Sequence, residues 1–221
     1  MLYSLLRDSL RFYLDHFVRF AQIILPFTLS LGLFSLLYDQ FILTDSNSPL
    51  QLYFPTAVAF LFRPVYQLAV LQSIDQSLKG SHPPIRSLWN MGWSKWRPMF
   101  LVSLLYSMAI FSGMMMFIVP GLYLAIKFCF AEIFVAVDDC DPVEAMKKSW
   151  QATTGRLLPL TGGFLLISLV LILPSMQWAN YASNSELSEF TGRFIPSIIF
   201  SLLGVFYTVF TFRVFDQARR P

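Results

Sequence analysis

Six stretches of mainly apolar residues, each long enough to form one membrane-spanning helix, constrain this chain more than any other feature. A bilayer core about 30 Å thick is crossed by roughly 20 apolar residues in an α-helix. Hydrophobic residues make up 56% of the 221 residues and charged residues only 13%, which excludes a soluble enzyme, a disordered chain and a disulfide scaffold. The sequence therefore predicts an all-α, polytopic protein with a single membrane domain over residues 1–221. The six transmembrane helices are predicted at 20–43, 53–78, 99–119, 121–137, 157–179 and 194–215.

Basic residues give the predicted helices an orientation. Thirteen of the 16 Lys and Arg residues fall in the N-terminal stretch, in the segments after the second and fourth spans, or at the C-terminal end. The opposite loops carry only Arg193. Because cytoplasmic segments are enriched in Lys and Arg, both termini are predicted to be cytoplasmic. The third and fourth spans are separated only by 119–121, Val-Pro-Gly, which predicts a tight turn.

Three further stretches, 1–19, 84–97 and 142–155, have the pattern of amphipathic helices. In the first, the apolar stripe is predicted at Leu2, Leu6, Leu10, Tyr13 and Phe17. Basic, aromatic-rich amphipathic helices lie in the membrane interface, so all three are predicted on the cytoplasmic surface in contact with lipid. The residues predicted to contact lipid are Trp89, Trp93, Trp96, Trp150, Lys95, Lys147 and Lys148.

The order of these elements repeats. An interfacial helix, an outward span and an inward span follow one another three times along the chain. This order fits a threefold tandem repeat of one ancestral unit. It also fits any protein with an even number of spans whose cytoplasmic segments form interfacial helices, and both interpretations stay open.

Three charged residues stand out inside the predicted spans: Arg63, Lys127 and Glu132. A charge at the middle of a bilayer costs about 2.5–3.5 kcal/mol on insertion scales, so each needs an explanation. Counted from the outer ends of their spans, Arg63 and Glu132 come to similar depths, and we expect them to pair between helices. Lys127 is expected to reach toward the outer interface. A structural ion pair is the interpretation we favour, and a polar cavity or ion pathway is the alternative.

Other chemistry finds little support in the sequence. His16 and His82 are isolated, so neither a metal site nor a catalytic triad is predicted, and no phosphate-binding, dinucleotide-binding or zinc-protease motif is present. The glycines of Thr161-Gly162-Gly163 are expected to allow close helix packing. We therefore predict no enzymatic activity, no cofactor and no nucleic-acid partner.

The most characteristic stretch runs from Ile118 to Arg156. It reads I-V-P-G-L-Y-L-A-I-K, then an apolar run, then V-D-D-C-D-P-V-E-A-M-K-K-S-W, and ends T-T-G-R. This stretch resembles the YciC-like family of bacterial inner-membrane proteins. Its pattern is also similar to that of the membrane domain attached to some glycerophosphodiester phosphodiesterases. The resemblance implies a polytopic inner-membrane protein without catalytic residues to carry over. Lys127 and Glu132 depart from the pattern, since the family would place apolar residues or proline there.

Two functions follow as expectations. The first is a non-enzymatic inner-membrane protein that contacts lipid and supports envelope homeostasis, with a membrane protein or a second copy as a further partner. The second is a small transporter or channel with a polar site around Arg63, Lys127 and Glu132. Convergence of these charges on a cavity would favour transport, whereas a dry core or headgroup contacts would favour the lipid-contacting scaffold.

Overall fold

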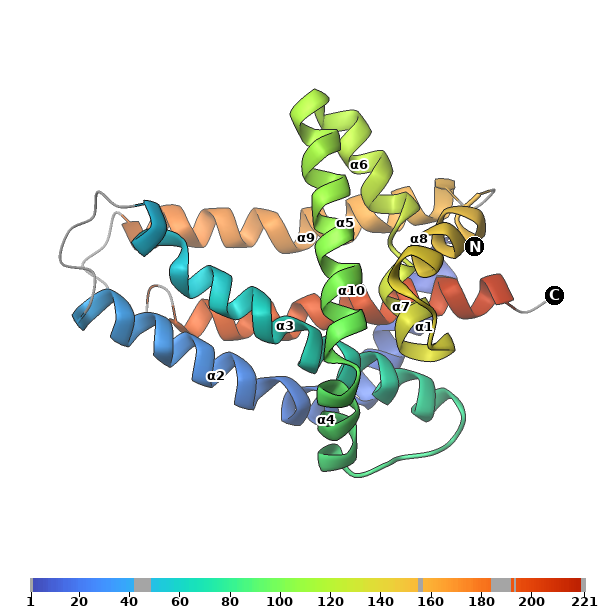
Figure 1. Cartoon of the computed structure of the whole chain (residues 1–221), viewed down its shortest axis with the longest axis horizontal. Coiled ribbons are helices and arrows are strands. Elements are labelled where there is room, and N and C mark those ends of the chain that lie inside the picture. The colour runs from blue at the N-terminus through green and yellow to red at the C-terminus, as the bar shows by residue number, and fades with distance from the viewer. Residues whose placement is uncertain (1, 42–48, 155–156, 184–191, 193, 220–221) are drawn as a thin grey trace.

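The computed structural model describes residues 2–41, 49–154, 157–183, 192 and 194–219, and these form an all-α structure (Figure 1). Among these described residues, six helical segments are long and apolar enough to cross a membrane. The chain is therefore a polytopic membrane protein, as predicted. The candidate spans are Phe17–Phe41, Tyr53–Leu78, Trp96–Met116, Ile118–Asp138, Leu160–Trp178 and Ile195–Arg219. Arg156, Arg193 and most of both loops opposite the termini lie outside the described residues.

The helices follow one another in the predicted order, with short helices at the three places where amphipathic segments were expected. They are α1 (Leu2–Asp15), α2 (Phe17–Phe41), α3 (Pro49–Leu78), α4 (Ile85–Ser94), α5 (Trp96–Met116), α6 (Ile118–Lys127), α7 (Ala131–Asp138), α8 (Pro142–Ala152), α9 (Leu157–Ser183) and α10 (Ile195–Arg219). The helix α8 begins with a proline, which suits the first helical turn because the amide groups there have no partner within the helix.

Four of the long helices, α2, α3, α9 and α10, run alongside one another in Figure 1, and α10 packs against the other three. The two termini lie at one end of this bundle, which we call the terminal end, and the last turns of α2 and α9 lie at the opposite, distal end. The hairpin of α5 and α6 runs crosswise to the bundle. The second of the three units is therefore arranged differently from the first and the third, although its elements come in the same order.

The turn between the third and fourth spans lies earlier than the sequence predicts. The helix α5 ends at Met116 and α6 begins at Ile118, so that Pro120 and Gly121 belong to the first turn of α6. Proline is tolerated there because first-turn amides make no intrahelical hydrogen bond. A Cβ atom on Gly113 would lie 2.8 Å from the Cα atom of Gly121, so the hairpin backbones touch at these two glycines.

The helix α1 buries only part of its predicted apolar stripe, together with residues beside the stripe. Leu5, Phe12 and Tyr13 are at most 8% exposed and pack toward α10, whereas Leu10 is 46% exposed and Phe17, the first residue of α2, is 38% exposed. In a membrane protein an apolar side chain need not enter the protein core, because lipid tails are equally apolar. The stripe therefore predicts an apolar surface but does not say whether protein or lipid covers it.

The tightest packing lies toward the terminal end, where side chains from several helices meet in one core. Phe20 of α2, Ile74 of α3, Leu88 of α4 and Phe215 of α10 are each at most 2% exposed, as is Phe130, which directly precedes α7. The side-chain amide of Gln72 donates to the backbone carbonyl of Ala136 within this region and ties α3 to α7. Side chains from several helices therefore pack closely at the terminal end.

Candidate functional site

A break in the fourth span places Glu132. The helix α6 ends at Lys127, α7 begins at Ala131, and the residues between them form a tight turn. Non-helical backbone at membrane depth is tolerated only where protein or water satisfies its polar groups. Here α8 supplies the partners, because the hydroxyl of Ser149 donates to the carbonyl of Lys127 at 2.8 Å and accepts from the amide of Phe130 at 3.1 Å. Thr153 adds a longer hydrogen bond to the same carbonyl at 3.3 Å.

Glu132 consequently lies in the first turn of α7, where the helix dipole favours a negative charge. Its two carboxylate oxygens accept hydrogen bonds from neutral side chains of other spans. Ser103 of α5 donates to one oxygen at 2.9 Å, and Gln67 of α3 donates to the other at 3.2 Å. The carboxylate is thus fixed between α3, α5 and α7.

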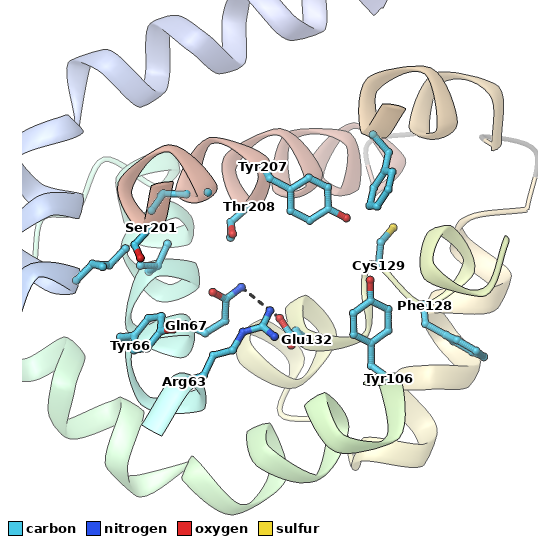
Figure 2. Close-up of a pocket in the computed structure, with 15 residues that line it drawn as sticks. Arg63, Tyr66, Gln67, Tyr106, Phe128, Cys129, Glu132, Ser201, Tyr207 and Thr208 are labelled. Carbon is cyan, nitrogen blue, oxygen red and sulfur yellow. Dashed lines mark hydrogen bonds between the residues drawn. The ribbon is translucent and has the colours of Figure 1, made fainter. Parts of the chain in front are cut away.

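Arg63 of α3 lies beside this carboxylate. Figure 2 shows its guanidinium next to Gln67 and Glu132. Within the described part of the chain, however, the guanidinium makes no hydrogen bond and no ion pair shorter than 4.0 Å. The predicted partners therefore meet at one place, but Glu132 is engaged by neutral donors, and Arg63 has no hydrogen-bond partner in the described part of the chain.

Arg63 and Glu132 both line a cavity of about 260 Å³, which we call the central cavity. Its wall combines the two charged residues with hydroxyl groups and aromatic rings from α2, α3, α5, α7, α9, α10 and the turn before α7. In Figure 2, Tyr207 and Thr208 of α10 face Arg63 and Glu132 from the opposite wall. The lining residues are Ile24, Arg63, Tyr66, Gln67, Val70, Tyr106, Phe128, Cys129, Glu132, Phe164, Ser201, Gly204, Val205, Tyr207 and Thr208.

A second cavity of about 340 Å³ lies toward the distal end, between α2, α3 and the start of α10. We call it the distal cavity. Tyr66 and Ser201 line both cavities, so the two are neighbours that share one stretch of wall. The distal cavity is lined by Thr28, Leu31, Gly32, Ser35, Leu36, Asp39, Pro55, Thr56, Ala59, Tyr66, Phe194, Ser197 and Ser201.

Lys127 does not take part in the central cavity. Its ammonium donates to the hydroxyl of Thr154 at 3.0 Å and lies 4.9 Å from the ring centroid of Trp150, and the residue is only 3% exposed. The sequence placed it near the outer interface, and this expectation is wrong. Because α6 ends at Lys127 and turns against α8, the side chain reaches the predicted cytoplasmic helix instead.

The four tryptophans of the amphipathic segments divide into two kinds. Trp89 donates to the carbonyl of Ile23 at 3.3 Å, and Trp96 donates to the carbonyl of Leu61 at 2.9 Å, so both attach their segments to the spans. Trp93 is 52% exposed and Trp150 is 38% exposed. Of the four, only Trp93 and Trp150 expose a large part of the indole ring.

The three lysines predicted to contact lipid also differ. Lys95 forms an ion pair with Asp139, and Lys148 forms one with Glu144 at 2.8 Å, which raises the pKa of Lys148. Lys147 is exposed on α8 and lies at the edge of a mainly apolar groove. That groove is lined by Phe128, Val143, Met146, Lys147, Trp150 and Gln151.

The contacts of several residues could not be predicted from the sequence. Gln67 and Ser103, which hold Glu132, share their spans with other neutral polar residues such as Gln72 and Ser107, so the sequence does not single them out. Spacing along the sequence also hid the approach of His16 to His82, whose ring centroids lie 6.0 Å apart. In the described residues no group of three or more His, Cys, Asp or Glu side chains is placed to hold a metal ion.

Comparison with known proteins gives one match. A family model described as a domain of unknown function, DUF7847, matches residues 98–218, which is more than half of the chain. The matched range runs from the first turn of α5 almost to the end of α10 and contains Glu132 but not Arg63. No curated protein and no solved structure matches the chain.

Proposed function

Because the chain belongs to the DUF7847 family, whose description names no activity, we propose a function from the site alone. The protein is a small, non-enzymatic membrane transporter that binds a polar ligand in the central cavity. The observation that carries this proposal is the meeting of Arg63 and Glu132, from the second and fourth spans, on the wall of one cavity. Charged residues inside spans that face a cavity are typical of substrate and ion pathways.

The shape of the fourth span supports the same function. Transporters bind their substrates where interrupted helices expose backbone and helix ends at membrane depth. The break between α6 and α7 is of this kind, and Phe128 and Cys129 of the break line the central cavity beside Glu132. Gln67 and Ser103 hold the carboxylate of Glu132 in position on this wall.

The bacterial inner membrane, with both termini in the cytoplasm, is the proposed location. The placement of Lys and Arg residues along the sequence supports this orientation. The resemblance of residues 118–156 to the YciC-like family supports the inner membrane, and the stretch lies within the range matched by the family model.

A second candidate function, contact with anionic lipid, is favoured by the groove on α8. Its apolar wall suits an acyl chain, while the exposed ammonium of Lys147 and the half-exposed indole of Trp150 suit a phosphate headgroup. This groove is separate from the central cavity except for Phe128, which lines both.

Native mass spectrometry of the detergent-extracted protein tests both candidates. Transport through the central cavity predicts a retained small solute that is lost in Arg63→Gln and in Glu132→Gln and kept in Lys147→Gln. Lipid binding on α8 predicts the opposite pattern for a retained phospholipid. A retained small solute that is unchanged in both Arg63→Gln and Glu132→Gln would overturn the transporter proposal.

A further inference from the structure

The central and distal cavities are neighbours that share the wall formed by Tyr66 and Ser201. Ser201 lies on the shared wall and is itself exposed, and the distal cavity leads from it to Asp39 and Thr56, near the end of α2 and the start of α3. On the terminal side, core side chains such as Ile74 and Phe130 are fully buried. The distal cavity is therefore the side from which access to the central cavity is considered.

The two charged residues of the central cavity, Glu132 and Arg63, differ in the hydrogen bonds that they already make. Both oxygens of Glu132 already accept hydrogen bonds, from Ser103 and Gln67. The guanidinium of Arg63 carries five N–H donors, and in the described part of the structure none of them has a protein acceptor. Although a carboxylate can accept further hydrogen bonds, Glu132 already has two partners and Arg63 has none, so the larger unmet capacity of the cavity is for an acceptor.

We propose that Arg63 receives the anionic group, a carboxylate or a phosphate, of a ligand that arrives through the distal cavity. This inference rests on the proposed function and names the ligand class of the same site. A planar guanidinium binds carboxylate and phosphate with two parallel hydrogen bonds, and such charge-assisted bonds are strong in a site of low dielectric. The hydroxyl groups of Thr208 and Tyr207, on the facing wall, can bind the remaining oxygens.

The competing ligand class is a cation held by Glu132. Such a cation would displace neutral donors that the carboxylate already has, and it would lie beside the positive charge of Arg63. An anion at Arg63 likewise lies beside a like charge, that of Glu132, but it displaces no existing hydrogen-bond partner. The arrangement of donors around the two charges therefore favours the anion.

A thiol on the wall shared by the two cavities can show whether the cavities attract anionic or cationic reagents. We would introduce Ser201→Cys in the full chain, with Cys129 and Cys140 replaced by alanine, and purify it in detergent. The thiol would then react with methanethiosulfonate reagents of similar size that carry either a sulfonate or a trimethylammonium group. The measured quantity is the ratio of the two reaction rates, after division by the same ratio for a free thiol.

The sulfonate reagent is expected to react about tenfold faster, the lower end of the effect of a charge-lined cleft on association. Arg63→Gln should remove this preference, and the exposed Arg97→Gln should keep it. No reaction with either reagent would overturn the proposed function, since the cavity would then be closed to solutes. Reaction without a preference, or with a preference for the cationic reagent, would leave the cavity intact and overturn the anion inference alone.

Protection of the same thiol identifies the source of the anionic group. Inorganic phosphate and acetate serve as free anions, and micelles doped with phosphatidic acid supply a lipid phosphate. Protection by the free anions identifies a soluble ligand, and protection only by phosphatidic acid identifies a lipid headgroup. In either case Arg63→Gln should abolish the protection. Protection that persists in that variant, or protection by neither kind of probe, would contradict a role for Arg63 as the anion-binding group.

Discussion

Ser149 of α8 donates a 2.8 Å hydrogen bond to the backbone carbonyl of Lys127, the last residue of α6. The same hydroxyl accepts from the amide of Phe130 on the other side of the break. One side chain thus satisfies both ends of an interrupted span. The amide of Phe130 depends on this hydroxyl, and the carbonyl of Lys127 has only the longer hydrogen bond from Thr153 besides it.

Replacing Ser149 with alanine is expected to lower the free energy of unfolding by about 1–3 kcal/mol, the loss for a buried polar group left without its partner. Thermal unfolding in a fixed detergent measures the change. Ser175→Ala is the matched control, because the exposed Ser175 hydroxyl bonds only to a carbonyl of its own helix, Ile172. Equal melting temperatures for the two variants would show that α8 does not stabilise the break.

Close packing of α9 on α10 at Gly163 gives a second prediction. A Cβ atom at Gly163 would overlap the ring of Phe210, whereas one at Gly204 meets nothing within 4 Å. Gly163→Ala should therefore destabilise the fold by about 1–3 kcal/mol, as overpacking does. Gly204→Ala should be neutral or stabilise by up to about 1 kcal/mol, since alanine favours a helix. Both are measured by thermal unfolding, and the reverse order would contradict the packing.

The third prediction concerns alkaline pH. Tyr13 of α1 is 4% exposed and donates to the carbonyl of Leu202 at 3.1 Å, and burial raises the pKa of its phenol above 10.0. The folded state therefore favours the neutral phenol. The stabilisation is complete below pH 10 and is lost as the pH rises through the higher pKa of the folded state.

Tyr13→Phe tests this relationship. It should cost about 1 kcal/mol at neutral pH through the lost hydrogen bond, and it should reduce the further loss of stability above pH 10. Tyr3→Phe on the same helix, at a position 76% exposed, is the control and should change neither quantity. An unaltered alkaline slope in Tyr13→Phe would show that another group is responsible.

A fourth prediction follows from the position of Arg63 and Glu132 around one cavity. Arg63→Glu or Glu132→Arg alone places two like charges there, and each should reduce the yield of folded protein in the membrane fraction. The double reversal should recover part of that yield, as measured by size-exclusion chromatography. Arg97→Glu combined with Glu132→Arg is the control and should give no recovery. A double reversal no better than the worse single variant would show that the two charges are independent.

The number of spans and their positions could be predicted because each span is encoded locally. A helix must be apolar over about 20 residues to cross a bilayer, and that requirement is visible in any one stretch. The six candidate spans begin and end within a few residues of the predicted ones. The amphipathic helices were predictable for the same reason, since their periodicity is local too.

The break in the fourth span and the crosswise hairpin could not be predicted in this way. The break is stabilised by Ser149 and Thr153, which belong to α8 rather than to the fourth span, and no pattern within residues 121–137 reveals them. The site was predictable only in part. Arg63 and Glu132 stand out as charges in apolar spans, but Gln67 and Ser103 become partners of Glu132 only through the packing of α3, α5 and α7.

The dependence of the broken span on α8 has a consequence for the order of membrane insertion. A continuous helix can complete its hydrogen bonds as it leaves the translocon. The carbonyl of Lys127, in contrast, gains its side-chain donors only after residues 149–153 have been synthesised. Until that segment has been synthesised, the turn before α7 has to remain hydrated or be held by the insertion machinery. The charged lining of the central cavity therefore takes its final form late, when the fifth span is about to enter the membrane.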